Sequence, residues 1–460
     1  MRVSPPFFIH LHFFGASISH PQTRTRRWRI RVPPPSFTRL RSDATSRLPV
    51  FPMVRYVPME SASNDPSRRP RSGGPGAKSE AIGDKHSGRR RLDGLDAARA
   101  IAVLGMVMAH FGPNPTPESL GGDIYGVILG RASILFALLA GVGVALLSRS
   151  RSGGGLWRVR GRLTLRGALL LPLGLWLQGL DHGVLVILQY YAVYFLLAAL
   201  VLSLSSRWLF VCAISAFTLG PLVYVFVKAI SPEWFIENPA TLGDPFGDIA
   251  GDILLSGAYP LATWSAPLLF GVWLGTRNLR AASTKLWMLW GGLAVAFAAP
   301  FVSNYLVENF GEPLIGPPRN PENAGFSNLL SSEAHSQMPL WMLGAVGAAT
   351  ATLAATLLIA DLLPRIMWPL AATGQLALTV YVGHLLILAT NEELLRRETV
   401  PEAAFTVGAF MLSAIAVCTI WRTLFSRGPL EAALAAPWWA LEKLFGRKEP
   451  PPFDKPTSSS

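Results

Sequence analysis

Residues 92–111 read LDGLDAARAIAVLGMVMAHF, an apolar segment with Arg99 near one end and His110 near the other. At about 100° and 1.5 Å per residue, the eleven-residue interval corresponds to three turns plus about 20°, which places both side chains on one helix face about 16 Å apart. An ionisable group at the centre of a bilayer helix costs about 2.5–3.5 kcal/mol on insertion scales, so each one is a candidate functional residue. The segment therefore predicts a membrane-spanning helix with a polar stripe.

The composition favours a membrane protein. Of the 460 residues, 15% are charged, whereas about 25% are charged in typical soluble domains. The net charge of +13 would suit a nucleic-acid partner, but most basic residues lie before residue 92 or in short loops between apolar runs, without a nucleic-acid-binding motif. Cys212 and Cys418 lie in apolar runs without metal-ligand spacing, so we expect no disulfide framework and no metal.

Residues 1–88 are rich in Arg, Pro, Ser and Gly without a sustained apolar period, which predicts a disordered, basic N-terminal tail. A weak signal peptide and an organellar transit peptide are alternative interpretations. A third, which we favour, is that translation starts at Met53 or Met59. Residues 89–426 form the predicted transmembrane domain, and 427–460 form a cytoplasmic tail whose stretch GPLEAALAAPWWALEKLFG is expected to be an amphipathic surface helix.

Ten apolar runs are long enough to cross a bilayer, for which about 20 residues are needed. The sequence therefore predicts an all-α, polytopic membrane protein of about ten transmembrane helices. The small residues in GVGVA (141–145) and GVWLG (271–275) favour close helix packing. The predicted spans are 92–111, 123–147, 164–181, 184–204, 207–229, 260–276, 286–307, 339–361, 368–390 and 402–424.

The distribution of Lys and Arg predicts the orientation of the spans. Alternate connections are basic, among them RRRLDG before the first span and SRSRSGGGLWRVRGRLTLR after the second, and the others are acidic or neutral. Both termini are therefore expected on the cytoplasmic side of an integral, multi-pass membrane protein. Arg396 and Arg397 are an exception on the predicted outer side, for which the sequence offers no physical reason.

The four histidines after residue 90 all fall on the predicted outer side: His110, His182, His335 and His384. Histidine can take or release a proton near neutral pH. For His182 we favour interfacial anchoring, and for His335 anchoring and function are equally supported. His110 and His384 lie inside apolar runs, so we favour a functional role for both.

At the predicted cytoplasmic end of the first span, Asp96 and Arg99 are three residues apart. They can form a local ion pair that is purely structural. Alternatively, Arg99 binds an anionic ligand from the cytosol, such as a phosphorylated cofactor, because a guanidinium grips phosphate in a bidentate manner.

LDGLDAAR, with a His eleven residues after its Arg, resembles the DGLRALA…H opening of the acyltransferase family 3 membrane proteins, whose Arg–His pair maps onto Arg99 and His110. The surrounding pattern is similar to the heparan-alpha-glucosaminide N-acetyltransferase-like proteins and the related YeiB-like bacterial membrane proteins. RASILFALLAGVGVAL, HSQMPLWMLGAVG and TGQLALTVYVGHLLIL resemble their later helices in the same order, and the likeness covers about residues 90–425. The heparan enzyme has Asn at the position of His110, and YeiB-like proteins commonly have another polar residue at His384. The assignment of His110 as the catalytic histidine therefore rests on the resemblance to the acyltransferase 3 pattern and not on the heparan enzyme.

The resemblance implies an enzyme of the bacterial cell membrane that moves an acetyl or other acyl group from cytosolic acetyl-CoA to a hydroxyl or amine of a sugar or envelope component on the outer side. Acetyl-CoA is then a substrate, and no permanently bound cofactor is expected. We predict that its pantetheine arm extends along the Arg99–His110 stripe, in a water-filled cleft among the first, second, eighth and ninth spans. The predicted catalytic residues are His110 as base or acetyl carrier, His384 as second acid or base and Tyr381 as oxyanion donor; donor binding is assigned to Arg99, Asp96 and Arg131, and the substrate side to His335.

Two other classes of function stay open. A proton-coupled transporter of a polar metabolite would also use buried His and Arg, although the sequence shows no inverted repeat and no matching pair of broken helices. A non-catalytic scaffold would use the same groups only to join helices. The expected partners are the lipid bilayer, acyl-CoA and the acceptor, and the oligomeric state is left open.

Overall fold

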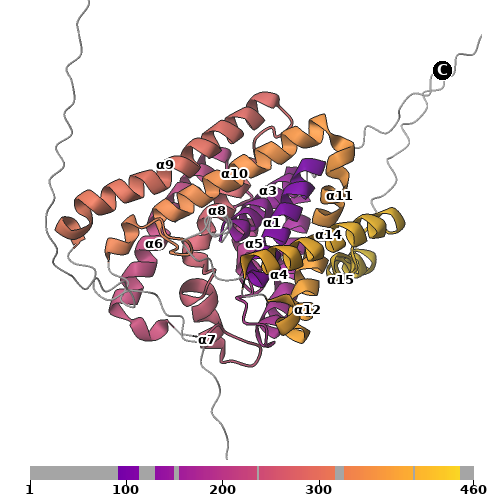
Figure 1. Ribbon diagram of the computed structural model, residues 1–460, viewed down its shortest axis with the longest axis horizontal. Coiled ribbons are helices and arrows are strands. Elements are labelled where there is room, and N and C mark those ends of the chain that lie inside the picture. Colours follow the sequence, from indigo (N-terminus) through magenta and orange to yellow (C-terminus); the bar gives the residue numbers. More distant parts are fainter. Residues whose placement is uncertain are drawn as a thin grey trace, which may run out of the picture. The chain divides into compact units, whose positions relative to one another are not determined.

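The computed structural model describes residues 92–112, 130–149, 155–235, 238–315, 326–396 and 399–445. All of them belong to one unit, Arg90–Ser460, and the predicted tail 1–88, the start of the second predicted span and the end of the cytoplasmic tail lie outside the described residues. Within the described ranges every regular element is a helix (Figure 1). The all-α class predicted from the sequence is therefore confirmed.

Most helices coincide with a predicted apolar run, and short 3₁₀ and π elements lie in the connections. The longest largely described connection joins α6 to α8 and contains η1, α7 and η2. The elements are α1 (Asp93–Phe111), α3 (Arg131–Arg149), α4 (Gly155–Gln178), α5 (Tyr190–Val201), α6 (Ser206–Ile230), η1 (Pro232–Trp234), α7 (Phe246–Gly251), η2 (Asp252–Ser256), α8 (Leu261–Gly275), α9 (Ala282–Ile315), η3 (Phe326–Leu330), α10 (Pro339–Leu362), α11 (Pro364–Gln375), α12 (Ala377–Thr390), α13 (Glu392–Leu395), α14 (Val400–Leu424) and α15 (Pro429–Phe445).

Helix α1 is a core helix that packs against α3, α10, α11, α12 and α14. Its alanines Ala97, Ala98 and Ala100 are fully buried, and such small side chains let neighbouring backbones come close. At the crossing with α11, a Cβ on Gly374 would lie 1.7 Å from the carbonyl oxygen of Asp96. The first predicted span is therefore surrounded by protein along most of its length.

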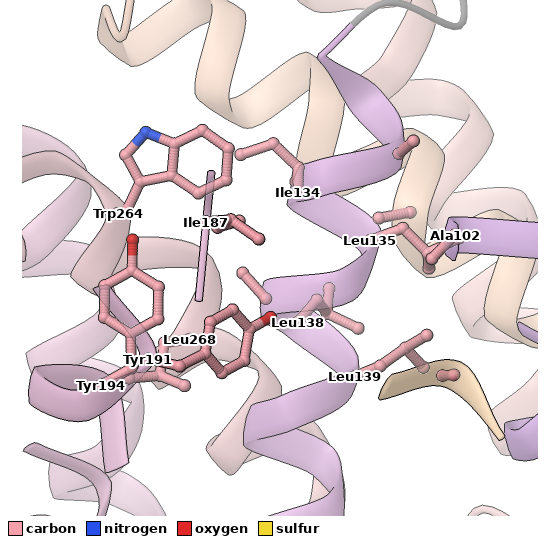
Figure 2. Close-up of a cluster of buried hydrophobic side chains, with 14 of the residues drawn as sticks. Ala102, Ile134, Leu135, Leu138, Leu139, Ile187, Tyr191, Tyr194, Trp264 and Leu268 are labelled. Carbon is pink, nitrogen blue, oxygen red and sulfur yellow. The ribbon is translucent and has the colours of Figure 1, made fainter. Parts of the chain in front are cut away.

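Helices α3 and α8 are in contact through the glycines of the two small-residue stretches. A Cβ at Gly141 would lie 2.2 Å from the carbonyl oxygen of Leu268, and a Cβ at Gly271 would lie 2.2 Å from that of Leu138. Figure 2 shows the buried cluster beside this contact, in which Tyr191 of α5 lies next to α3. The close packing predicted for both stretches is confirmed.

Six of the described helices are long and apolar enough to cross a membrane, or up to eight if each bent pair counts as one span. The bent pairs are α7 and η2 with α8, at 57°, and α11 with α12, at 65°. The two remaining predicted spans, 164–181 and 184–204, coincide with α4 and α5. Helix α4 carries several arginines in its first half. Helix α5 has 12 residues, which at about 18 Å is shorter than the roughly 30 Å hydrocarbon core.

The ninth predicted span, 368–390, is two helices. Helix α11 ends at Gln375 and α12 begins at Ala377. Leu376 between them has φ −107° and ψ 24°, which is outside the α-helical range. The first N–H groups of α12 therefore have no partners in α11 and need other acceptors inside the protein.

Candidate functional site

Two of the predicted catalytic residues, His110 and His384, are in direct contact. Nδ1 of His110, in the last turn of α1, lies 2.9 Å from Nε2 of His384, in α12. Their rings are stacked, with centroids 5.1 Å apart and planes 16° apart. His384 is fully buried and His110 is half-buried. The fold thus joins two histidines that are 274 residues apart in the sequence.

The surroundings of His384 define the protonation of the neutral pair. Its Nδ1 lies 3.2 Å from the carbonyl oxygen of Val380, and a carbonyl only accepts, so the proton of neutral His384 resides on Nδ1. Nε2 of His384 then accepts the hydrogen bond that Nδ1–H of His110 donates. This leaves the lone pair of His110 on Nε2, where a general base needs it.

Tyr381, the third predicted catalytic residue, lies beside this pair. Its ring meets the ring of His384 edge-on, with centroids 5.1 Å apart. Its hydroxyl accepts a hydrogen bond from the backbone N–H of Ile187 at 3.2 Å. Because the hydroxyl oxygen is the acceptor there, its own proton is not used in that bond. The oxyanion-donor role stays a prediction.

In the connection between α4 and α5, the N–H groups of residues 183–187 make no helical hydrogen bonds. Gln178 replaces them, because its Nε2 donates to the carbonyl oxygen of Val184 at 3.1 Å and its Oε1 accepts the N–H of Val186 at 2.7 Å. Tyr381 accepts the next N–H, that of Ile187. Non-helical backbone at membrane depth is tolerated where protein groups satisfy it in this way. Tyr381 thus joins this segment, whose next residue Leu188 lines the cavity described next, to the helix that carries His384.

A cavity of about 460 Å³ lies at the opposite end of α1 from His110. Three arginines line it: Arg99 of α1, Arg166 of α4 and Arg427, just before α15. Between them and the far end the walls are mostly apolar, from Phe136, Leu139, Val144, Leu147, Leu163, Leu170, Phe195, Leu378 and Leu434, and the cavity extends to Leu188 and Tyr191. A cationic mouth and an apolar interior suit an anionic ligand with an apolar arm.

The Asp96–Arg99 pair predicted from the spacing is present. Nη1 of Arg99 lies 2.5 Å from Oδ1 of Asp96, and Nη2 is next to Gly143, where a Cβ would lie 3.3 Å from it. Asp96 is buried, whereas the Arg99 side chain keeps 27% of its surface exposed. The pair fixes the guanidinium while leaving part of it accessible in the cavity.

The predicted path along the Arg99–His110 stripe is filled by protein. Val103, Met106 and Val107, between the two residues on α1, are 0 to 3% exposed. The cavity that contains Arg99 instead passes between α3 and α4 toward α5. There the hydroxyl of Tyr191 is buried without a hydrogen-bond partner among the described residues, so it is available to a ligand.

The break between α11 and α12 borders the same cavity. Glu431 of α15 caps α12, because its Oε1 accepts the N–H groups of Leu378 and Thr379 at 2.8 and 3.1 Å and its Oε2 accepts the Thr379 hydroxyl. The segment predicted as an amphipathic surface helix is α15, and it packs against α4 and α12. A side chain from the C-terminal helix thus replaces the missing turn of α12.

Arg131 and His335 lie elsewhere. Arg131 is not among the residues that line the arginine cavity, and its neighbour Gly130 faces His335, with Nε2 3.1 Å from a Cβ built there. His335 has φ 63°, is exposed and stacks on Trp341 with ring centroids 5.9 Å apart. The structure therefore places Arg131 and His335 near each other and away from Arg99.

Arg396, the exception to the predicted charge distribution, is hydrogen-bonded to the turn that follows α4. Its Nη2 donates to the carbonyl oxygen of His182 at 2.7 Å, and its Nη1 pairs with Glu392 at 2.5 Å. His182 is buried; its Nε2–H donates to the carbonyl of Leu177 and its Nδ1 accepts the N–H of Val184. Burial is the main cause that lowers the pKa of His182, and the Arg396 cation adds to it. Arg397 lies outside the described residues.

Sequence reasoning missed Arg166, Arg427, Glu431 and Tyr191. Arg166 belongs to the basic stretch after the second predicted span, and Arg427 and Glu431 belong to the predicted cytoplasmic tail. Of these residues, Arg166 could have been found from the sequence, because it lies inside the predicted span 164–181. A charged residue inside a membrane span is costly and is therefore a candidate functional residue. The other residues enter the site through contacts between distant helices.

A family model described as an acyltransferase domain matches residues 184–422, which is 239 of the 460 residues. The matched region contains Tyr381 and His384, whereas Arg99 and His110 precede it. No curated protein matches the chain.

Proposed function

Since the chain belongs to the acyltransferase 3 family and is a multi-pass membrane protein, we propose that it transfers an acetyl or other acyl group from acyl-CoA to a hydroxyl or amine. The observation that carries the proposal is the hydrogen bond between His110 and His384, which leaves a free imidazole nitrogen on a half-buried base. The sugar or envelope acceptor and the choice of acetyl rest on the likeness to heparan-alpha-glucosaminide N-acetyltransferase-like proteins.

The arginine cavity is the proposed donor site. Arg99, Arg166 and Arg427 would bind the phosphates of CoA, because guanidinium groups form bidentate, charge-assisted hydrogen bonds to phosphate. The apolar walls would hold the pantetheine arm, with the unpaired hydroxyl of Tyr191 as a polar contact. On the predicted orientation this end of the bundle faces the cytosol, where acyl-CoA is available. Asp96 would act by holding Arg99 in place.

At the histidine pair, Nε2 of His110 would take the proton of the acceptor hydroxyl or amine while the acceptor atom attacks the thioester carbonyl. The carbon–sulfur bond then breaks, and the departing CoA sulfur receives the proton from His110. His384 accepts from Nδ1–H of His110 and so supports the positive charge on its ring during the step. General-base catalysis of this kind is worth about 10²–10⁴-fold.

The acyl group would approach the pair from Leu188 and Tyr191. The chain segment that contains Ile187 and the ring of Tyr381 lies between the cavity end and His384, so this wall has to open for transfer. We assign His335 to the acceptor side. We assign Arg131 there as well, because its neighbour Gly130 faces His335.

The experiment uses the full-length protein in detergent and radiolabelled acetyl-CoA. We expect saturable binding and slow release of CoA, with water as the acceptor. His110→Ala should bind acetyl-CoA as the wild type does but lose CoA release, whereas Arg99→Gln should lose binding. Absence of saturable acetyl-CoA binding in the wild type would contradict the proposal, and full CoA release by His110→Ala would contradict the assigned base.

A further inference from the structure

Two tryptophans of α15, Trp438 and Trp439, lie next to the arginine cavity. One turn before them on the same helix, Leu434 and Ala435 line the cavity. Arg427 lines it as well, and its guanidinium carbon lies 4.2 Å from the centroid of the Trp439 ring. Trp439 itself is not a lining residue. A single arginine side chain therefore connects the cavity to an indole outside it.

The two tryptophans have different surroundings. Trp438 is packed against α4, because a Cβ on Gly161 would lie 3.2 Å from its ring and the guanidinium of Arg162 lies over it at 5.4 Å. Trp439, in contrast, keeps 38% of its surface exposed while it stacks with Arg427. Trp438 thus fastens α15 to α4, whereas Trp439 has surface left for a ligand.

The chain around Arg427 fixes its position. Its carbonyl oxygen accepts the indole N–H of Trp421 at 2.8 Å, and α15 begins two residues later, at Pro429. The N–H groups of a guanidinium lie in its plane, so stacking on an indole leaves them available for hydrogen bonds. Arg427 can therefore bind a phosphate and stay stacked on Trp439.

The order of the chemical groups in acyl-CoA places its nucleotide outside the cavity. The thioester arm and the adenosine are attached to opposite ends of the diphosphate. When the arginines bind the diphosphate and the arm extends toward Tyr191, the adenosine extends the other way. The cavity of about 460 Å³ is in the lower part of the range of about 300–1,000 Å³ for drug-sized ligands, and acyl-CoA is larger than such ligands.

We propose that the exposed indole of Trp439 stacks on the adenine ring of the donor, beside phosphates that Arg427 binds. The inference rests on the proposed acyl transfer and adds a nucleotide subsite to its donor cavity. Purine bases stack on aromatic rings and on guanidinium planes, and Trp439 and Arg427 supply both. The C-terminal helix then distinguishes acyl-CoA from a donor that presents the same arm without adenosine.

The test compares acetyl-CoA with acetyl-4′-phosphopantetheine, which keeps the arm and one phosphate but has no adenosine. Binding of the two radiolabelled compounds to the full-length protein in detergent gives two Kd values for each variant. Trp439→Leu removes the aromatic plane, and Trp439→Phe keeps one. The control is Trp208→Leu, because Trp208 on α6 is also an exposed tryptophan, at 62%, and does not line the cavity.

We expect Trp439→Leu to raise the Kd of acetyl-CoA about tenfold, which is within the range for loss of a base–aromatic stack. The Kd of acetyl-4′-phosphopantetheine should not change, and its retained binding shows that the variant is folded. Trp439→Phe should raise the Kd of acetyl-CoA less than Trp439→Leu does. Trp208→Leu should change neither Kd.

An equal rise of both Kd values in Trp439→Leu would overturn the inference, because Trp439 would then support the cavity or anchor α15 at the membrane surface. Unchanged Kd values in Trp439→Leu, or equally tight binding of the two compounds by the wild type, would also overturn it, since the adenosine would then make no contact with Trp439. Failure of the proposed function gives a different pattern, because the wild type would then bind neither compound.

Discussion

Glu431 Oε2 accepts a 2.6 Å hydrogen bond from the hydroxyl of Thr379. The two residues belong to α15 and α12, and the same carboxylate also accepts the first N–H groups of α12. A helix that begins inside a membrane protein needs such acceptors, because no water competes for its N–H groups there. The C-terminal helix is therefore part of the site, since Glu431 also lines the arginine cavity.

Glu431→Ala should destabilise the protein, because it leaves N–H groups of α12 unsatisfied. The expected cost is about 1–3 kcal/mol for a buried polar group that loses its partner. Glu431→Gln keeps one acceptor oxygen and should cost less. Unfolding in detergent measures both. The control on the same helix is Glu442→Ala, whose exposed side chain makes a 3.4 Å pair with Arg162 and should change stability by less than about 1 kcal/mol. Equal effects at 431 and 442 would contradict the capping role.

The break between α11 and α12 shows why part of the site could not be predicted. The run 368–390 is mostly apolar, with Gln375 and His384 as its exceptions, so its hydropathy indicates one span. What permits the break is a carboxylate that arrives from α15, and no local pattern encodes that contact. In contrast, Arg99, His110 and His384 were predictable because an ionisable residue in an apolar run is unusual wherever the helix packs. Their partners depend on the tertiary fold.

Arg166→Gln should weaken acetyl-CoA binding, because Arg166 lines the cavity and a charge-assisted hydrogen bond is worth about 1.5–3 kcal/mol. That corresponds to at least about a tenfold rise in Kd. The variant should also make binding less sensitive to salt. Arg158→Gln is the control, because Arg158 is on the same helix, is exposed and does not line the cavity. Equal Kd values for both variants would remove Arg166 from the donor site.

Gly374→Ala should unfold or strongly destabilise the protein. A Cβ there would lie 1.7 Å from the backbone oxygen of Asp96, so α1 and α11 would have to separate, at a cost of about 3 kcal/mol or more. Gly408→Ala, with no described atom within 4 Å of the new Cβ, should instead be neutral or stabilising by about 0.5–1 kcal/mol. Unfolding midpoints of the two variants measure the difference, and similar midpoints would show that the crossing is looser than described.

The non-helical connection between α4 and α5 is a second feature that could not be predicted from the sequence. Its residues VLVIL (184–188) are apolar, and apolar runs alone favour continuation of a helix. The non-helical course of this segment depends on Gln178, which bonds to Val184 and Val186, and on Arg396, which donates to the carbonyl of His182 in the turn before it. Arg396 stood out in the sequence as a basic residue on the predicted outer side, but its contact with the turn at His182, 214 residues away, could not be inferred from spacing.

The stability of this turn should depend on pH through His182. Only the neutral ring can accept the N–H of Val184 on Nδ1 while it donates from Nε2, and burial lowers the pKa of His182 in the folded protein. The unfolded chain therefore takes up the proton first, below about pH 6.5. The contribution of His182 to stability is complete above that pH and declines as the pH falls toward the folded-state pKa.

The measurement compares the unfolding midpoints of wild type and His182→Gln from pH 8 to pH 5, so that other titrating groups cancel in the difference. We expect wild type to be more stable at pH 8 and the gap to narrow toward pH 5. A gap that stays constant would mean that His182 contributes by packing alone. A gap that widens on acidification would mean that the charged ring is the stabilising form, which contradicts the hydrogen-bond assignment, because a protonated Nδ1 would face the N–H of Val184 as a second donor.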